Sequence, residues 1–450
     1  MYKTIIKNGT IVNEGKRFEG YLIIEGETIR EVAEGNIPEQ LEHEANEVID
    51  ANGLWVLPGA IDDQVHFREP GLTHKAEIAT ESRAAVAGGV TSFMEMPNTH
   101  PQTTTLDTLK WKYERAADVS VANYSFYIGA TNDNADVLRQ IDFREVCGIK
   151  IFMGSSTGNM LVDNAATLER IFSESPALIA VHCEQEEIIR NNREYYTRRF
   201  GNDLPIYFHP MIRSAEACYT SSSRAAELAD RTGARLHLLH LSTARELTLL
   251  DSRPLSEKKI TGEACVHFLW FDDNNYAEYG NRIKWNPAIK TCADRLAMLE
   301  GIRNGKLDVV ATDHAPHLPA EKIGNCLRAA SGGPLVQHSL QVMLELHLRG
   351  EFPLETVVQK MAHAPADLYR IDRRGYLRPG YFADIVLVNP NRRYMVSPAN
   401  ILSKCGWSPF EGHTFPCSIE RTWVNGVTAF ADGAVSDTCR GKRLLFHPDR

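Results

Sequence analysis

The two ends of the chain alternate between apolar and polar residues, whereas the middle carries longer apolar runs. The alternating segments contain or adjoin glycine turns and lie at 7–12 (KNGTIV), 21–29 (YLIIEGETI), 380–390 (GYFADIVLVNP) and 421–433 (RTWVNGVTAFADG). Alternation with such turns is typical of short antiparallel strands. We therefore expect residues 1–54 and 371–450 to come together as one small β-sandwich domain.

Between the two ends, short apolar runs alternate with helical patterns. The runs lie at 53–62 (GLWVLPGAID), 89–96 (GVTSFMEM), 120–129 (SVANYSFYIG), 147–153 (CGIKIFM), 177–184 (ALIAVHCE), 234–242 (ARLHLLHLS), 258–266 (KKITGEACV) and 308–316 (DVVATDHAP). Helical patterns ending at glycine lie at 74–89, 214–233 and 292–305. Buried parallel strands that alternate with helices predict an α/β fold, a (β/α)8 TIM-like barrel over residues 55–370. An open doubly wound sheet is the alternative, but no Gly-x-Gly-x-x-Gly follows the first strand.

Composition and charge narrow the class of partner. The chain has 450 residues, a net charge of -9, and acidic and basic residues that are interspersed. Nucleic acid and anionic membranes are therefore not expected as partners, and an anionic substrate would need a few local cations. The first ten residues lack an apolar signal core, no long apolar span occurs, and the nine cysteines form no Cys-x-x-Cys pair. These features predict a cytoplasmic protein with reduced thiols.

Polar residues that suit metal binding close several of the apolar runs. Five of the eight runs carry or lead into such residues: Gln64, His66, Arg68, Lys150, His182, His240 and Asp313. Working residues of a barrel lie at the carboxyl ends of its strands, so we expect these side chains to meet. A lone histidine after an apolar run is more often structural, and His237 is interpreted that way. His182 and His240 on neighbouring strands predict a shared metal.

Two of these residues suggest specific chemistry. A buried carboxylate at Asp313 needs a cation partner. Lys150 lies between apolar residues, and its simpler interpretation is a pairing with a carboxylate. The alternative is a desolvated, neutral amine that reacts with carbon dioxide to form a carbamate, which is an anionic oxygen ligand.

Seven stretches together resemble the dihydroorotases of the amidohydrolase superfamily. They are 58–101 (with HFREPG and MPNT), 148–164, 181–189, 240–246, 283–290, 311–317 (ATDHAPH) and 378–390, with SPFEG at 408–412. The resemblance implies a zinc enzyme with one or two Zn2+ ions. It also implies reversible cyclisation of N-carbamoyl-L-aspartate to L-dihydroorotate in pyrimidine (UMP) biosynthesis.

The resemblance also assigns roles to residues by position. His66, Lys150 as a carbamate, His182, His240 and Asp313 match metal ligands, and Asp313 also matches the residue that moves the proton. The remaining matches are substrate contacts: Arg68, Asn98, His317, Asn286, Ser331 and Gly332. Arg68, Asn98 and His317 would hold the substrate carboxylate, and Ser331–Gly332 would offer backbone groups to the ring.

One position departs from the family pattern. Gln64 stands where the pattern has the first histidine of His-x-His, and a glutamine carbonyl is a weaker zinc ligand than imidazole. Gln64 can bind a metal weakly, or stand aside and leave one tightly held ion. The third interpretation is a metal-poor, non-catalytic partner of another pyrimidine enzyme. Because the other matching residues are in place, we expect catalysis.

Other functions and associations stay open at this stage. Hydantoinases, dihydropyrimidinases and allantoinases share the barrel and metal site, but their substrates lack the ring carboxylate that Arg68 would bind. The sequence does not decide between a monomer and a homo-oligomer, or whether the chain associates with another pyrimidine-pathway enzyme. Residues 152–164 (FMGSSTGNMLVDN), small and polar after a strand, are one candidate for a loop that closes over substrate.

Overall fold

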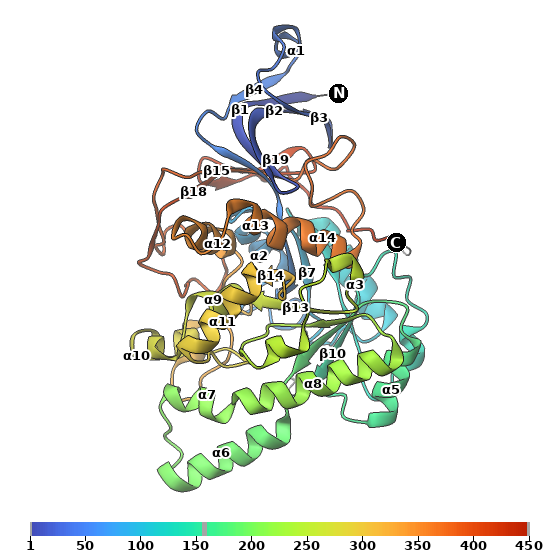
Figure 1. Ribbon diagram of the computed structural model, residues 1–450, viewed down its shortest axis with the longest axis vertical. Helices are drawn as coiled ribbons and strands as arrows, with labels where there is room; N and C mark the ends of the chain where they lie inside the picture. Colours follow the sequence, from blue (N-terminus) through green and yellow to red (C-terminus); the bar gives the residue numbers. More distant parts are fainter. Residues whose placement is uncertain (1, 155–159, 448–450) are drawn as a thin grey trace.

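The protein combines a barrel of parallel strands with a sheet built from both ends of the chain (Figure 1). The computed structural model describes residues 2–154 and 160–447. Residues 155–159, the centre of the segment expected to close over substrate, lie outside the described residues. The barrel forms the lower part of Figure 1 and the terminal sheet lies above it.

Eight strand positions form the barrel. They are β6 (Ala60–Val65), β7 (Val90–Glu95), β8 (Asn123–Phe126) continued by β9 (Ile128–Gly129), β10 (Ile149–Met153), β11 (Ile179–Cys183), β12 (Leu236–Leu238), β13 (Ile260–Cys265) and β14 (Val309–Ala311). Neighbours pair in parallel, in the orders β6-β7-β8 and β9-β10-β11-β12-β13-β14. A parallel bridge between Val65 and His314, with the His66 N–H donating to the His314 carbonyl at 2.7 Å, joins the last strand to the first. The predicted (β/α)8 architecture is therefore confirmed.

Helices cover the outside of the barrel (Figure 1). The longer ones are α2 (Ile78–Ala87), α3 (Leu106–Val119), α5 (Ala165–Glu174), α6 (Glu186–Phe200), α8 (Ala215–Thr232), α11 (Cys292–Arg303) and α12 (Ser339–Leu348). The shorter ones are α4 (Ala135–Leu138), α7 (His209–Ile212), α9 (Val266–Trp270), α10 (Tyr276–Tyr279), α13 (Leu354–Val358) and α14 (Ala364–Tyr369). Helix α1 (Glu39–His43) lies away from the barrel, beside the terminal sheet. The three helices predicted from glycine-terminated patterns are α2, α8 and α11. In α8, Ser214 caps the first turn and Gly233 ends the helix in the left-handed conformation.

The terminal sheet has nine strands drawn from both ends of the chain. They are β1 (Lys3–Asn13), β2 (Lys16–Glu25), β3 (Thr28–Glu34), β4 (Glu47–Asp50), β5 (Trp55–Pro58), β15 (Ile385–Asn389), β18 (Ser418–Val424), β19 (Val427–Ala431) and β20 (Ala434–Val435). A separate pair is formed by β16 (Tyr394–Met395) and β17 (Thr414–Phe415). The N-terminal and C-terminal parts join where β5 pairs antiparallel with β15.

One predicted strand is wrong in its extent. Residues 53–62 were expected to form a single barrel strand, but β5 belongs to the terminal sheet and only β6 belongs to the barrel. Gly59 separates them and lies against Thr91, where a Cβ atom on residue 59 would come within 2.1 Å of the threonine hydroxyl. The chain can turn from one sheet into the other here because glycine leaves room for Thr91.

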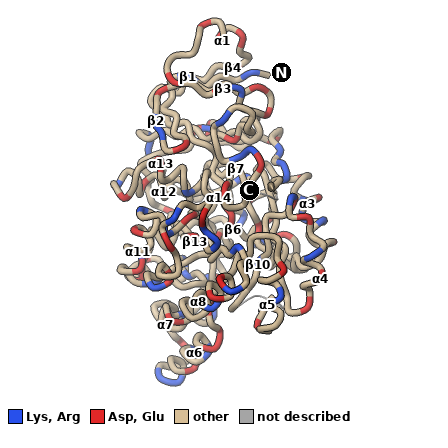
Figure 2. The backbone as a smooth tube through the Cα atoms, turned by 45° about the vertical axis from the view of Figure 1, so that its right-hand side comes forward, with Lys and Arg blue, Asp and Glu red and all other residues tan. Residues whose placement is uncertain are grey.

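Figure 2 shows Lys and Arg residues interspersed with Asp and Glu residues, which agrees with the pattern in the sequence. Among the described residues, no helix combines the length and apolar character needed to cross a membrane.

The barrel core contains a cluster of aromatic rings that permits a stability prediction. Phe93 is fully buried, and its ring lies 4.4 Å from that of Phe67 and 6.4 Å from that of Phe126. Phe93→Ala should lower the free energy of unfolding by about 3–5 kcal/mol, because it leaves a cavity between β6 and β8. Trp111→Ala on α3, where the side chain is 42% exposed, is the control and should change it by less than about 0.5 kcal/mol. Denaturant titration of both variants measures the difference, and equal losses would contradict the assignment of Phe93 to the core.

Candidate active site

A cavity of about 480 Å³ lies at the carboxyl ends of the barrel strands and collects every candidate residue named from the sequence. Its lining includes Gln64, His66, Arg68, Asn98, Lys150, His182, His240, Asn286, Asp313, His317, Ser331 and Gly332. Further lining residues that the sequence did not single out include Lys75, Gln102 and Trp285. Residues up to 268 positions apart in the chain (332 − 64 = 268) therefore share one cavity.

Local backbone geometry turns the strand ends toward this cavity. The β6–β7 register shifts between Asp62 and Val65, so β6 contains one extra residue around Asp63 and Gln64. Such bulges re-aim side chains next to functional sites. Arg68, His240 and Asp313 all have positive φ angles, of 69°, 40° and 50°, which non-glycine residues rarely adopt. Backbone strain of this kind is concentrated at functional sites.

His66 and Asp313 form the first pair of candidate metal ligands that face each other in the cavity. His66 Nδ1 lies 2.8 Å from Asn98 Oδ1, so this nitrogen carries the proton and donates it to Asn98. His66 Nε2 then points its lone pair at Asp313 Oδ1, 3.1 Å away. Burial holds the pKa of His66 well below its usual value, so the ring is neutral. Two acceptors face each other here unless Asp313 carries a proton or a cation lies between them.

Asp313 has the electrostatics of a group that exchanges protons. Burial raises the pKa of Asp313 to about 7, although Lys150 and His182 lower it in part. A carboxyl group with a pKa near the working pH can both accept and return a proton.

His182 and His240 form the second pair. His182 Nδ1 and His240 Nε2 lie 2.9 Å apart, and both rings are buried. Contacts outside the pair hold both residues in place. His182 Nε2 lies 3.3 Å from the carboxylate of Glu184, which also pairs with Arg213. The backbone N–H of His240 donates a 2.8 Å hydrogen bond to Glu263. Outer contacts that fix ring orientation are usual for metal-binding histidines.

Lys150 enters the same cavity from β10. Its side chain is buried, and the described part of the chain provides no hydrogen bond or ion pair to its Nζ atom. This atom lies 4.6 Å from the centre of the Phe152 ring. Burial lowers the pKa of Lys150 to about 8, so a sizeable fraction of the amine is neutral near neutral pH. The simpler interpretation, a structural ion pair with a carboxylate, therefore has no geometric support among the described residues. A neutral amine is the form that reacts with carbon dioxide.

The donor set fits a divalent metal. Imidazole nitrogens and carboxylate or carbamate oxygens from neighbouring strand ends are the ligand types that zinc uses. The facing acceptors of His66 and Asp313, and the facing nitrogens His182 Nδ1 and His240 Nε2, are atoms that a metal would satisfy.

Gln64 is turned away from a ligand role. Its side-chain Nε2 donates to Asp313 Oδ1 at 3.4 Å, and its carbonyl Oε1 faces Cys265 Sγ at 3.8 Å. The side chain thus contacts the carboxylate of Asp313 with its amide N–H, and its only oxygen points at a thiol.

The other end of the cavity is cationic. Arg68 is buried, its Nε donates to the Pro316 carbonyl at 3.2 Å, and its Nη2 lies 3.2 Å from His317 Nε2. Burial, with Arg68 and Lys75 nearby, lowers the pKa of His317 to about 2, so this ring is neutral. Across the residues that the structure describes, Arg68 has no carboxylate partner within ion-pair distance, whereas Lys75 pairs with Glu321 at 2.9 Å. Burying a cation without an anionic partner costs free energy, and an anionic ligand bound beside Arg68 would offset that cost.

The remaining predicted contacts differ in what they can offer. Asn286 has a buried Oδ1 without a hydrogen-bond partner among the described atoms. Gly332 has φ +120°, and its N–H already donates to the Lys284 carbonyl at 2.8 Å, so this N–H is not free for a ligand. Gly332 therefore enters the site as part of its wall, and Ser331 lines the cavity beside it.

The sequence did not identify three residues that contact the candidate site residues or their neighbours: Glu184, Lys75 and Glu263. Glu184 follows His182 closely within 181–189, and that adjacency to a histidine was the available signal. Lys75 and Glu263 gave no signal, because their partners lie far away in the sequence. His237, interpreted as structural, makes a 2.8 Å hydrogen bond to Thr261 and lies outside the cavity lining.

Comparison with known proteins identifies what this arrangement resembles. Residues 55–429 match the amidohydrolase family. A dihydroorotase of Halobacterium salinarum is 34% identical over 394 residues, 86% of this chain and 89% of that protein. An allantoinase of Bacillus velezensis is 29% identical, with 96% of this chain and 95% of that protein covered. Among solved structures, the L-hydantoinase of Arthrobacter aurescens superposes with a TM-score of 0.91 at 25% identity, covering 99% of this chain and 100% of that one.

Proposed function

Because this chain belongs to the amidohydrolase family and is a hydrolase of cyclic amides, we propose that it is a dihydroorotase that interconverts L-dihydroorotate and N-carbamoyl-L-aspartate. The observation that carries the proposal is Arg68. Its guanidinium is buried at one end of the cavity without a carboxylate partner among the described residues, next to the neutral ring of His317. L-Dihydroorotate has one ring carboxylate, which a forked guanidinium binds with two charge-assisted hydrogen bonds.

The site residues would divide the work between the two ends of the substrate. Arg68, with His317 and the amide N–H2 of Asn98, would hold the carboxylate, and Asn286 would accept from a ring N–H. His66, Lys150 as its carbamate, His182, His240 and Asp313 would hold zinc. A bound zinc ion supplies a Lewis acid that polarises the ring carbonyl and acidifies water.

Asp313 performs the proton transfers in this proposal. In ring opening it accepts one proton of the attacking water and delivers it to the ring nitrogen as the carbon–nitrogen bond breaks. It then accepts the second proton of that water from the new carboxyl group, so Asp313 is protonated when ring opening ends. In ring closure the same carboxyl group returns these protons in reverse order. The two sides differ by one water molecule, so one set of residues serves both directions. Synthesis of dihydroorotate for pyrimidine formation would be the biological direction.

The pH dependence should reflect this role. Burial raises the pKa of Asp313 to about 7, and ring opening needs its ionised form. kcat/KM for ring opening should therefore fall as pH decreases below about 7, approaching about tenfold per unit. Ring closure needs the protonated form and should fall as pH increases above that value. Initial rates in both directions between pH 5 and 9 test this, and parallel profiles in the two directions would contradict it.

Gln64 is proposed to hold Asp313 rather than a metal. Gln64→Leu keeps a similar volume and removes the amide, so zinc content should stay unchanged. The acid limb of ring opening should move to higher pH, because loss of a donor to the carboxylate raises the pKa of Asp313. Metal analysis and a pH profile measure both effects, with His66→Asn as the control that should lose zinc. Loss of zinc from Gln64→Leu would make Gln64 a ligand after all.

A different cyclic amidase is the competing function, favoured by the similarity to an allantoinase and to an L-hydantoinase. A panel of L-dihydroorotate, 5,6-dihydrouracil, hydantoin and allantoin separates the candidates, because only the first carries a ring carboxylate. The proposal predicts kcat/KM for L-dihydroorotate at least tenfold above the other three. A neutral substrate in first place would replace dihydroorotase with the matching amidase.

A further inference from the structure

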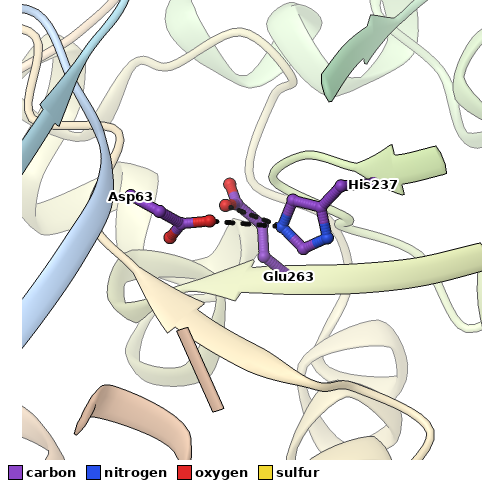
Figure 3. Close-up of side chains that lie close together, drawn as sticks. All are labelled: Asp63, His237 and Glu263. Atoms are coloured by element: carbon purple, nitrogen blue, oxygen red, sulfur yellow. Dashed lines mark ion pairs between the residues drawn. The ribbon is translucent and has the colours of Figure 1, made fainter. Parts of the chain in front are cut away.

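A second polar cluster lies inside the barrel, separate from the cavity. Asp63 on β6, His237 on β12 and Glu263 on β13 are each fully buried, and none of them lines the cavity (Figure 3). His237 Nε2 lies 3.3 Å from Asp63 Oδ2 and 3.5 Å from Glu263 Oε2. Figure 3 shows the two carboxylates pointing at the same ring nitrogen. The proposed mechanism uses none of these three side chains as a contact to substrate.

Hydrogen bonds determine where the proton of His237 lies. The Thr261 hydroxyl donates to the Leu236 carbonyl at 3.1 Å, so toward His237 it can only accept. His237 Nδ1, 2.8 Å from that hydroxyl, must therefore carry a proton and donate it. This leaves Nε2 facing two carboxylates. A lone pair there would face acceptors only, so a cation, either a proton or a metal ion, has to lie at this point.

Charge balance favours more than one positive charge. A proton on His237 Nε2 leaves two carboxylates and one imidazolium, a net charge of -1 in the barrel interior. A divalent cation beside a neutral imidazole neutralises both carboxylates.

The spacing also fits a metal. Charge-assisted N–H···O contacts are typically about 2.7–2.9 Å long. Two ligands bound tetrahedrally at about 2.1 Å from one ion lie about 3.4 Å apart. The separations of 3.3 and 3.5 Å agree with the second arrangement.

His237 and Glu263 are each anchored through one heteroatom and have the other free toward the cluster, whereas Asp63 faces His237 Nε2 with Oδ2, the same oxygen that Tyr369 holds. Asp63 Oδ2 accepts from the Tyr369 hydroxyl at 2.9 Å, His237 Nδ1 is held by Thr261, and Glu263 Oε1 accepts from the His240 N–H. Among the described residues, Asp63 Oδ1, His237 Nε2 and Glu263 Oε2 are buried without a hydrogen-bond partner. In metal sites, hydrogen bonds from surrounding residues hold each ligand side chain in the orientation that the metal needs.

We propose that Asp63, His237 and Glu263 bind a divalent metal ion, Zn2+ or Mn2+, inside the barrel, at a site distinct from the catalytic cavity. One imidazole and two carboxylates suit Zn2+ and Mn2+. The ion joins β6, β12 and β13. Through Glu263 it also supports the backbone of His240, so it links the barrel interior to the cavity without contacting substrate. Because the site is closed to solvent, its ion should resist chelators that remove metal from the cavity.

The first test is X-ray diffraction from crystals of the whole protein grown with 1 mM ZnCl2, or with MnCl2 in a second crystal. Data collected on both sides of the metal absorption edge give an anomalous map. An anomalous peak between the three side chains is expected. No peak there from either metal would overturn the proposal and assign the cation as a proton on His237.

Metal counting with matched variants is the second test. His237→Asn keeps an N–H for Thr261 and removes only the Nε2 ligand, while His182→Asn changes only the cavity. After chelator dialysis, wild type and His182→Asn should each retain one ion per chain by mass spectrometry, and His237→Asn none. Retention by His237→Asn, folded by circular dichroism, would contradict the proposal. The diffraction test needs no variant, so it decides the matter if His237→Asn does not fold. Neither test depends on which cyclic amide the enzyme opens.

Discussion

Asp313→Asn is expected to reduce kcat for ring opening by about 10²–10⁴-fold while the barrel stays folded. Asparagine has nearly the same shape and keeps one oxygen at the position that faces His66 Nε2, but it cannot accept a proton. Because the mechanism needs one group to accept and return protons, both reaction directions should fail together. Stopped assays of ring opening and closure, with metal content measured on the same samples, provide the comparison.

The control for this experiment is Asp107→Asn, which changes an exposed carboxylate in the first turn of α3. Its rates should match those of the wild type. If Asp313→Asn retains its metal and more than a tenth of the wild-type rate, Asp313 is not the proton carrier.

Arg68→Met is expected to raise KM for L-dihydroorotate about 30- to 1000-fold, equivalent to about 2–4 kcal/mol of lost carboxylate binding. Methionine preserves much of the apolar stem and removes the guanidinium that lies beside His317. A neutral cyclic amide, such as 5,6-dihydrouracil tested as a competing ligand, should bind equally well to both proteins. Steady-state kinetics and competition assays give the two values.

Arg198→Met, on the exposed surface of α6, is the matched arginine control and should leave KM unchanged. An unchanged KM for Arg68→Met would remove the carboxylate role, and with it the reason to prefer dihydroorotate over neutral cyclic amides.

Many of the residues that line the cavity could be predicted, because polar residues at the ends of apolar runs mark the carboxyl ends of the barrel strands. His182 and Asp313 each follow an apolar run, and parallel strands bring their carboxyl ends to one rim, so spacing alone predicted that they meet. The resemblance to known enzymes added Asn98 and Asn286, which as isolated asparagines have no distinctive pattern. The structure adds a second role for Asn98, because its side-chain oxygen accepts a hydrogen bond from His66 Nδ1.

Other features depend on contacts that no local pattern encodes. The apolar run at 53–62 looks continuous, and only the pairing of β5 with β1 and β15, and of β6 with β7, shows that it crosses from one sheet into another. The side chain of Gln64 was ambiguous as a ligand, and its direction follows from the bulge in β6 and from Asp313 and Cys265. His237 looked structural in isolation, because Asp63 and Glu263 lie 174 and 26 residues away (237 − 63 and 263 − 237).

The most direct test of the central claim is ultraviolet-monitored ring opening of L-dihydroorotate by the purified protein, as isolated and again after addition of zinc. The account predicts turnover in at least the zinc-supplemented sample, with Gln64 in place and Arg68 binding the carboxylate. No turnover in either sample, with the protein folded and neutral cyclic amides also left intact, would contradict it and point to a partner protein that keeps the enzyme's fold without its activity.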